Sequence, residues 1–277
     1  HPWWAALRGG WPRAHAAPYG WGLVVPYWVC QLKADSLWVA TSRLLFWHAM
    51  MAPLAALCAW RMSGRSLLAG VVVGIAVAMD PGLIDTALSG AEGYLGAFWI
   101  GCMTLAVLYR DSQAAPILAS LFFALAVMNH PLAAAAAPLL FCLRLADRRT
   151  WFGLAVGMAV LSPHVFRLLG ESVTGGGSLG LPGEALPAYI NQGGAAGWLV
   201  LTGPLVGMLH RRTRGMSVAV LSAWAGMVCL GMELGYLRDH HLRLLTVPAL
   251  MGWSTAPLLG SVLCLLFVRV PQHPVFP

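Results

Sequence analysis

Ionisable side chains are sparse in this chain, and three acids gather between two of its long apolar runs. These acids are Asp80, Asp85 and Glu92. A positioned carboxylate can take the proton of an attacking hydroxyl or amine. Helix capping by Asp80 and Glu92, or ordinary solvation of each acid, is the simpler interpretation. We predict that the three carboxylates line one cavity and act as the catalytic group.

A basic cluster lies much later in the chain, at the start of the last apolar run. The segment 238–243 reads RDHHLR. Arginine forks pair with phosphate oxygens, and histidine donates hydrogen bonds or titrates. We therefore predict a site for a lipid phosphate, with an interface-anchoring flank as the alternative. The predicted phosphate ligands are Arg43, Arg238, His240, His241 and Arg243.

Other polar residues offer weaker signals. Asn129 and His130 end another apolar run at the same expected depth as the acids. His48 and His164 could serve a pigment or haem, but they form no evident pair at one depth. The adjacent His240 and His241 would diverge by about 100° on a helix, so they make a poor metal pair. No metal site is indicated by the sequence, and a divalent metal cofactor is left open.

The elements that carry these residues are expected to be transmembrane helices. Hydrophobic residues make up 59% of the 277 residues and charged residues 10%, against about 25% charged in soluble domains. The apolar runs are continuous and do not alternate, which favours helices over a barrel. The net charge of +7 comes from short arginine groups between these runs. That distribution is typical of membrane topology and excludes nucleic acid as the expected partner.

We predict an all-α, polytopic transmembrane bundle of about nine spans. Several spans are shorter than the roughly 20 residues of a simple crossing, which indicates tilted or broken helices. Pro81 and Pro131 each predict a turn at the preceding residue. The expected spans are 37–60, 66–79, 92–109, 114–128, 131–145, 150–169, 195–209, 216–236 and 242–269.

The charges of the connections alternate between the two sides of this bundle. Arginine-rich connections face the cytoplasm by the positive-inside rule. One side receives Arg61, Arg65, Arg110, Arg144, Arg148, Arg149, Arg211, Arg212, Arg214 and Arg269, with Asp111 and Asp147 as its acids. The other side receives Asp35, Asp80, Asp85, Glu92, Glu171, Glu184 and Asp239. We therefore place the predicted site at the outer face, where Asp80, Asp85 and Glu92 should line one cavity with Arg238, His240 and Arg243.

Two further segments are assigned to the outer side. Residues 1–36 form an outer juxtamembrane segment, in which the apolar stretch 22–32 is too short to cross and carries Trp and Tyr suited to the interface. The loop 170–194 is rich in Gly and Pro and is expected to be irregular, either as a lid or as a connector. The remainder, 37–277, is one transmembrane domain.

Four segments together resemble GT-C-type membrane glycosyltransferases. They are PYGWGLVVPYWVCQLKADSLWVATSRLLFWHAMMAPLAAL, MDPGLIDTALSGAEGYLGAFWIG, NHPLAAAAAPLLF and DHHLRLLTVPALMGW. The resemblance is to the protein mannosyltransferase and aminoarabinose transferase groups, which use polyprenyl-phosphate sugars. It implies a carboxylate as the base and arginines that hold the lipid phosphate. That family carries its principal acid in the first outer loop, whereas residues 1–34 here contain no Asp or Glu.

The expected function is transfer of a sugar from a polyprenyl-phosphate carrier at the outer face of a bacterial-type inner membrane. Membrane lipid, the lipid-linked sugar and other membrane subunits are the expected partners. The resemblance leaves two possibilities for the acid that residues 1–34 lack. It lies in an upstream span, or it is absent and the chain is an inactive relative. The rival of a different class is a non-catalytic subunit packed in a larger membrane complex. A transporter or pigment-binding protein is the third alternative.

Overall fold

The computed structural model describes residues 37–88, 93–170, 182–233, 237 and 239–260, and every regular element within them is a helix. Its first half contains α4 (Leu37–Met62), α5 (Leu67–Ala78), α6 (Pro81–Leu88), α7 (Gly93–Leu108) and α8 (Ala115–Asn129). The second half contains the 3₁₀ helix η1 (Pro131–Cys142), α9 (Arg148–Gly170), α10 (Pro182–Met208), α11 (Arg214–Glu233), α12 (Asp239–Leu242), η2 (Arg243–Leu245), α13 (Thr246–Leu250) and η3 (Met251–Thr255).

Local sequence signals explain where several of these helices begin and bend. Ser66 caps α5, because its hydroxyl accepts a hydrogen bond from the Ala69 amide at 3.3 Å. Proline cannot continue the hydrogen-bond ladder of α5, and Pro81 instead opens α6 after a bend of 52°. In α10 the backbone leaves helical geometry at Gly194, with φ of 52°, a value that glycine adopts at little cost.

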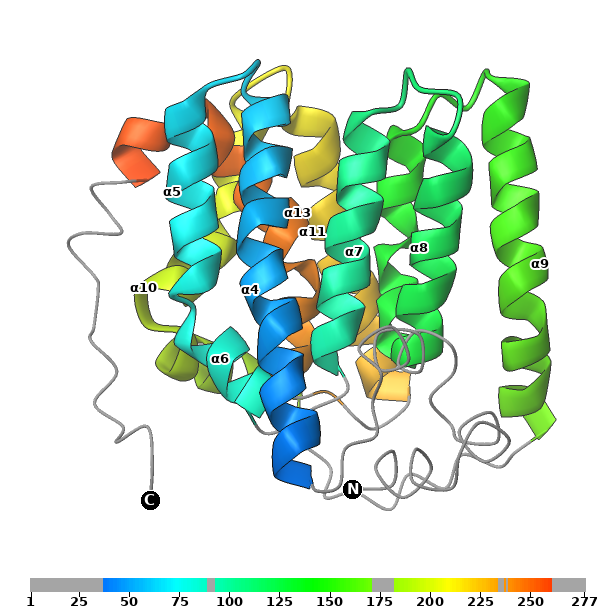
Figure 1. Ribbon diagram of the computed structural model, residues 1–277, viewed down its shortest axis with the longest axis horizontal. Coiled ribbons are helices and arrows are strands. Elements are labelled where there is room, and N and C mark those ends of the chain that lie inside the picture. The colour runs from blue at the N-terminus through cyan, green and yellow to red at the C-terminus, as the bar shows by residue number, and fades with distance from the viewer. Residues whose placement is uncertain (1–36, 89–92, 171–181, 234–236, 238, 261–277) are drawn as a thin grey trace.

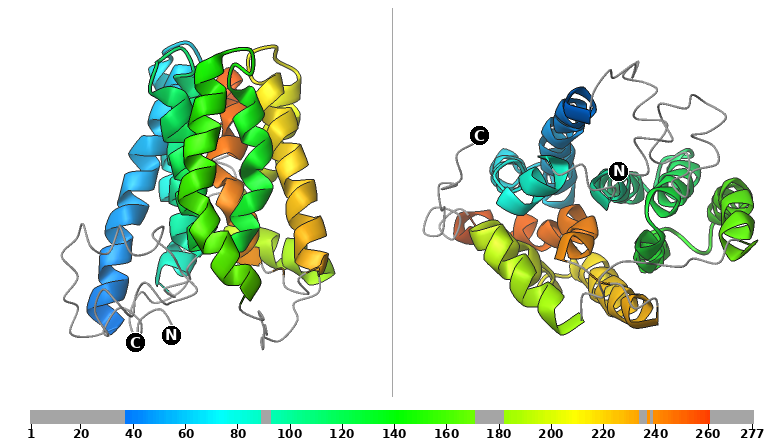
Figure 2. Two further views of the ribbon diagram at one scale, coloured as in Figure 1. Left: turned by 90° about the vertical axis from the view of Figure 1, so that its right-hand side faces the viewer. Right: turned by 90° about the horizontal axis from the view of Figure 1, so that it is seen from below.

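The helices form a bundle around the chain's last described segment. Figures 1 and 2 show α12, η2, α13 and η3, in orange, between the group α4, α5 and α7 and the pair α10 and α11. Close packing here depends on small residues. A side chain at Gly203 or Gly252 would collide with the backbone of the facing segment, at Ala249 and Gly203 respectively. Glycine therefore permits α10 to touch the central segment directly.

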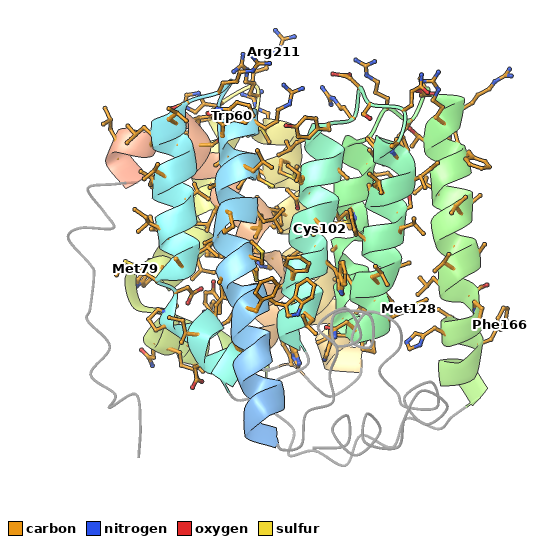
Figure 3. All side chains as sticks on the ribbon, viewed as in Figure 1. Trp60, Met79, Cys102, Met128, Phe166 and Arg211 are labelled. Carbon is orange, nitrogen blue, oxygen red and sulfur yellow. The ribbon has the colours of Figure 1, made fainter. Side chains whose placement is uncertain are left out.

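One end of the bundle collects the arginines of four connections, and we call it the arginine end. The α4–α5, α7–α8, η1–α9 and α10–α11 connections all lie there, and side-chain nitrogen atoms gather around them (Figures 1 and 3). The alternation of charge along the sequence predicted that these connections lie on the same side of the bundle. The residues are Arg61, Arg65, Arg110, Arg144, Arg148, Arg149, Arg211, Arg212 and Arg214, whereas Arg269 lies outside the described residues.

Large apolar side chains are exposed on the outer helices. On α5, Leu67 is 77% exposed and Val71 55%, and on α9, Trp151 is 60% and Phe166 73% exposed. Such extensive apolar exposure calls for a covering partner or a membrane.

By length and composition, one described helix could cross a membrane alone, in the window Arg214–Gly231. The bent pair Leu67–Ala78 and Pro81–Ala87 makes a second candidate if it is one broken span. The other apolar helices of the described chain are shorter, at 10–17 residues: Ala49–Met62, Leu95–Leu108, Ala115–Asn129, Pro131–Cys142 and Ala196–Met208. The prediction of an all-α bundle is confirmed, and the prediction of about nine spans is not.

Three further expectations need correction. The loop 170–194 is helical from Pro182, a residue whose fixed φ suits the first position of a helix, and α10 continues through Pro187. The run 242–269 is not one helix: its described part consists of short α and 3₁₀ pieces, with Pro248 among them. Helix α6 occupies part of the connection between the expected spans 66–79 and 92–109, where no span was predicted, and it follows the turn that was predicted before Pro81. The predicted juxtamembrane helix 22–32 lies outside the described residues.

Candidate functional site

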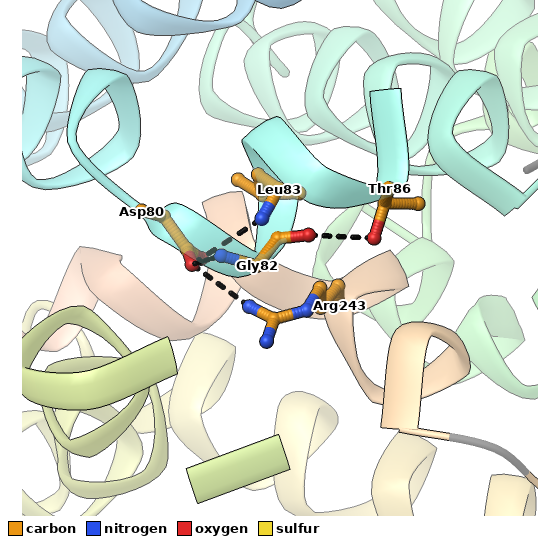
Figure 4. Close-up of polar contacts among 5 residues, drawn as sticks. All are labelled: Asp80, Gly82, Leu83, Thr86 and Arg243. Carbon is orange, nitrogen blue, oxygen red and sulfur yellow. Dashed lines mark hydrogen bonds and ion pairs between the residues drawn. The ribbon is translucent and has the colours of Figure 1, made fainter. Parts of the chain in front are cut away.

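A buried ion pair joins two segments that are far apart in the chain. Asp80 accepts a hydrogen bond from Arg243, with 2.8 Å between Oδ1 and Nη1, across 163 residues of sequence (Figure 4). Both side chains are 1% exposed. Burying two charges costs several kcal/mol per ion unless the pair is well hydrogen-bonded. Their presence in an apolar bundle therefore marks a polar centre.

Asp80 is held by the break between α5 and α6. Its Oδ1 accepts hydrogen bonds from the amides of Gly82 at 3.0 Å and Leu83 at 3.3 Å, which caps the start of α6. Thr86 donates back to the Gly82 carbonyl at 2.6 Å and tightens the same turn. Figure 4 shows the Gly82 and Leu83 amides and the Arg243 guanidinium directed at the same oxygen of Asp80. One oxygen atom thus carries the cap and the ion pair together.

Arg243 lies in η2, and three residues shape the space around its guanidinium. The guanidinium carbon lies 4.7 Å from the centre of the Tyr189 ring, a cation–π distance. A side chain at Gly82 would collide with the guanidinium, and one at Gly193 would come within 3.5 Å of Nη2. Glycine at position 82 leaves the room that the guanidinium occupies, whereas a side chain at position 193 would make ordinary van der Waals contact with it. Gly193 directly precedes the break in α10.

Several polar atoms of this centre have no hydrogen-bond partner among the described residues. They are Asp80 Oδ2, Arg243 Nε and Nη2, and the hydroxyl of Tyr189. Leaving a buried donor or acceptor unpaired costs about 1–3 kcal/mol, and such groups are uncommon in native proteins. The centre can therefore make further hydrogen bonds. One carboxylate oxygen of Asp80 can accept, and two guanidinium nitrogens of Arg243 can donate.

A second polar group lies on the neighbouring elements. The rings of His130 and His241 lie 4.5 Å apart between centroids. His130 also caps η1, since its Nδ1 accepts from the Leu132 amide at 3.2 Å. The amide atoms of Asn129 are buried without a partner among the described residues. His241 is fully buried two residues before Arg243, so these side chains extend the polar centre toward α8 and η1.

The structure brings together some of the residues predicted from the sequence and separates others. Asp80 and Arg243 meet as expected, but they are enclosed by the bundle and do not line an open cavity. Asp85 is exposed on α6. His241 is buried against His130. Arg43 lies in α4 and His240 in α12, but their side chains, like the residues Glu92 and Arg238, lie outside what the structure describes.

Sequence reasoning missed Tyr189, Gly82 and Gly193. Tyr189 falls in the stretch expected to be an irregular loop, so it had no predicted position relative to Arg243. The two glycines matter only because the guanidinium lies beside them. The local sequence carried one usable signal: a glycine following Asp-Pro predicts a tight turn, although it does not predict the partner.

No described His, Cys, Asp or Glu side chains form a group of three that could hold a metal ion. Comparison of the chain with protein-family models, with curated proteins and with solved structures finds no match. Inferences about function therefore depend on the geometry and on the sequence patterns alone.

Proposed function

We propose that this chain is a multi-pass membrane protein whose Asp80–Arg243 centre binds the phosphate of a polyprenyl-phosphate-linked sugar and transfers that sugar. The observation that carries the proposal is the buried pair with unpartnered atoms on both residues. Ionisable residues inside a membrane bundle are expensive and are functional candidates by default. The family resemblance of the sequence points to the same chemistry.

Membrane placement is supported by the surface and by the ends of the bundle. Apolar side chains such as Leu67, Phe141 and Leu209 are 69–79% exposed, which suits contact with lipid. The arginines gather at one end, as the positive-inside rule requires of a cytoplasmic face. The short helices would cross as paired or broken elements, in a bilayer that thins locally to match them.

Cysteine labelling in intact cells tests this placement. In a variant without its native cysteines, Arg212→Cys should react with an impermeant reagent only after the membrane is permeabilised. Reaction in intact cells would reverse the topology and place the Asp80–Arg243 centre on the cytoplasmic side.

The proposed transfer assigns one task to each member of the pair. The acceptor's hydroxyl or amine gives its proton to Asp80 Oδ2 while its oxygen or nitrogen bonds to the anomeric carbon of the sugar. The bond from that carbon to the phosphate oxygen breaks, and the polyprenyl phosphate leaves with the electron pair. Arg243 stabilises the charge that develops on the phosphate. The phosphate takes the unpartnered Nε and Nη2 of Arg243, while Nη1 stays on Asp80. Because the pair is enclosed, its entry requires the surrounding helices to part, and the break of α10 at Gly194 adjoins Gly193 beside the guanidinium.

Binding of a polyprenyl-phosphate sugar to the purified chain in lipid nanodiscs tests the proposal. Arg243→Lys keeps the charge but loses the fork that pairs with phosphate oxygens, so binding should weaken about tenfold or more. Arg144→Lys makes the same change in an exposed ion pair and should leave binding unchanged. Equal binding by all three proteins would contradict a role for Arg243 in holding the phosphate.

A non-catalytic membrane subunit is the second candidate, and the enclosure of the pair favours it. A 1% exposed pair that links the α5–α6 break to η2 holds these segments together without any ligand. In that case the chain should migrate with other subunits when native membranes are solubilised gently. Migration as a free chain with sugar transfer activity would exclude this candidate.

A further inference from the structure

A second polar feature lies at the opposite end of the bundle from the Asp80–Arg243 centre. A cavity of about 660 Å³ opens at the arginine end between α4, α7, η1 and α11. Its rim carries Arg61, Arg110 and Arg212, and the one acid among its described lining residues is Asp111. Asp111 is already engaged by Arg144, with 2.6 Å between the charged atoms. The cavity therefore has an excess of positive charge.

The rim arginines retain donors that a ligand can use. Arg212 has no acid partner among the described residues and lies against Gly64, where any side chain would collide with its guanidinium. Arg110 makes one long hydrogen bond, 3.4 Å from Nη1 to the Cys142 carbonyl. Arg61 is stacked at 4.9 Å over the ring of Tyr109, which fixes its direction. Arg110 and Arg212 thus have most of their N–H donors available to a ligand, and the Arg61 guanidinium is held in place by the Tyr109 ring.

Below this rim the walls of the cavity are apolar. They include Val107 on α7, Pro138 and Phe141 on η1, and Val218 on α11. Phe141 is 69% exposed and Val218 46% exposed, so the wall continues onto the outer surface of the bundle. A basic rim above an apolar wall that opens to the side matches a molecule with an anionic head and a hydrocarbon tail.

We infer that this cavity binds one anionic phospholipid of the cytoplasmic leaflet, with its phosphate on Arg110 and Arg212 and an acyl chain along Phe141 and Val218. The inference uses the membrane placement proposed above and is independent of any role for Asp80 and Arg243. Arginine forks suit phosphodiester oxygens, and basic pockets between helices on the cytoplasmic side are where anionic headgroups bind. Charge complementarity and the continuous apolar wall select a lipid over a free anion, which would use the rim alone.

Native mass spectrometry of the purified full chain with phosphatidylglycerol or phosphatidylcholine tests the inference. The wild-type chain should retain phosphatidylglycerol in preference to phosphatidylcholine. The double variant Arg110→Gln/Arg212→Gln should lose about tenfold in retention, as expected for the loss of charge-assisted contacts. The matched control, Arg148→Gln/Arg149→Gln, removes the same charge from exposed positions at the same end that do not line the cavity, and it should retain the lipid.

Each other outcome overturns the site. An equal loss of phosphatidylglycerol retention in the two double variants would mean that the net charge of this end binds the lipid, and not the cavity. Displacement of phosphatidylglycerol by inorganic phosphate would identify a free-anion site. Should the double variant not fold, Arg212→Gln replaces it, because that residue has no acid partner to lose. A chain that stays monodisperse without detergent would refute the membrane placement, whereas a chain that needs detergent but shows no preference for phosphatidylglycerol would refute this site alone.

Discussion

Two ion pairs among the described residues have similar geometry and opposite surroundings. The charged atoms of Asp80 and Arg243 are 2.8 Å apart with both side chains 1% exposed, whereas those of Asp111 and Arg144 are 2.6 Å apart with both side chains 60% exposed. By distance alone, the two pairs would be expected to contribute equally to stability. Solvent decides their energies, because water screens an exposed pair and its loss leaves no stranded charge. A buried pair that loses one member leaves the other uncompensated.

The largest expected effect comes from breaking the buried pair. Arg243→Gln should lower the free energy of unfolding by about 3–5 kcal/mol, because Asp80 is left charged in an apolar interior. Reversible unfolding of the purified protein in mixed detergent micelles measures the change. A loss below about 1 kcal/mol would show that water reaches the pair and that the bundle is more open than described.

The next effect comes from filling the space that Arg243 occupies. A methyl group at Gly82 would collide with the guanidinium, so Gly82→Ala should cost about 1–3 kcal/mol through overpacking. Gly215→Ala is the control, since a side chain there meets nothing within 4 Å. This control should be neutral or stabilise by up to about 1 kcal/mol, as alanine favours the helix. Equal effects at the two glycines would mean that the guanidinium lies elsewhere.

Tyr189 separates a structural role of the centre from a binding role. Its hydroxyl is buried without a partner among the described residues, so Tyr189→Phe should raise the free energy of unfolding by about 1 kcal/mol or leave it unchanged. Under the proposed function the same change weakens binding of the lipid-linked sugar, since one donor near the phosphate is lost. A clear loss of stability would instead reveal that the hydroxyl has a hydrogen-bond partner.

The smallest effect is expected at the exposed pair. Arg144→Gln should change the free energy of unfolding by less than about 1 kcal/mol, and by less still at high salt. Its measurement under the same conditions as Arg243→Gln gives the comparison directly. A cost as large as that of Arg243→Gln would mean that the α7–α8 and η1–α9 connections are buried, for example against a partner.

Periodicity and charge located most of the helices before the structure was known. The predicted 37–60, 66–79 and 114–128 correspond to α4, α5 and α8 within two residues at each end. Continuous apolar runs ended by Pro, Gly or Arg make such boundaries readable. Membrane crossing was harder to predict, because short apolar helices satisfy composition without the length that a span requires.

The candidate site was predictable only in part. Asp80 and Arg243 could be placed at one depth because Asp80 follows one apolar run and Arg243 lies at the start of another, and opposite charges at one depth can pair. Burial could not be predicted, and it is burial that separates Asp80 from the exposed Asp85 five residues later. Tyr189 was out of reach because a stretch with Gly and Pro at both ends concealed a helix. The contact between His130 and His241 likewise depends on how distant helices pack.

A double variant measures the central claim most directly. Asp80→Asn/Arg243→Met removes both charges, keeps a side-chain oxygen to cap α6 and fills the space of the guanidinium. Replacing a buried pair by apolar volume is often neutral for stability, so this variant should fold while its binding of a polyprenyl-phosphate sugar in nanodiscs falls about tenfold or more. A folded double variant that binds the lipid-linked sugar as tightly as the wild type would contradict the account and leave Asp80 and Arg243 as a structural pair.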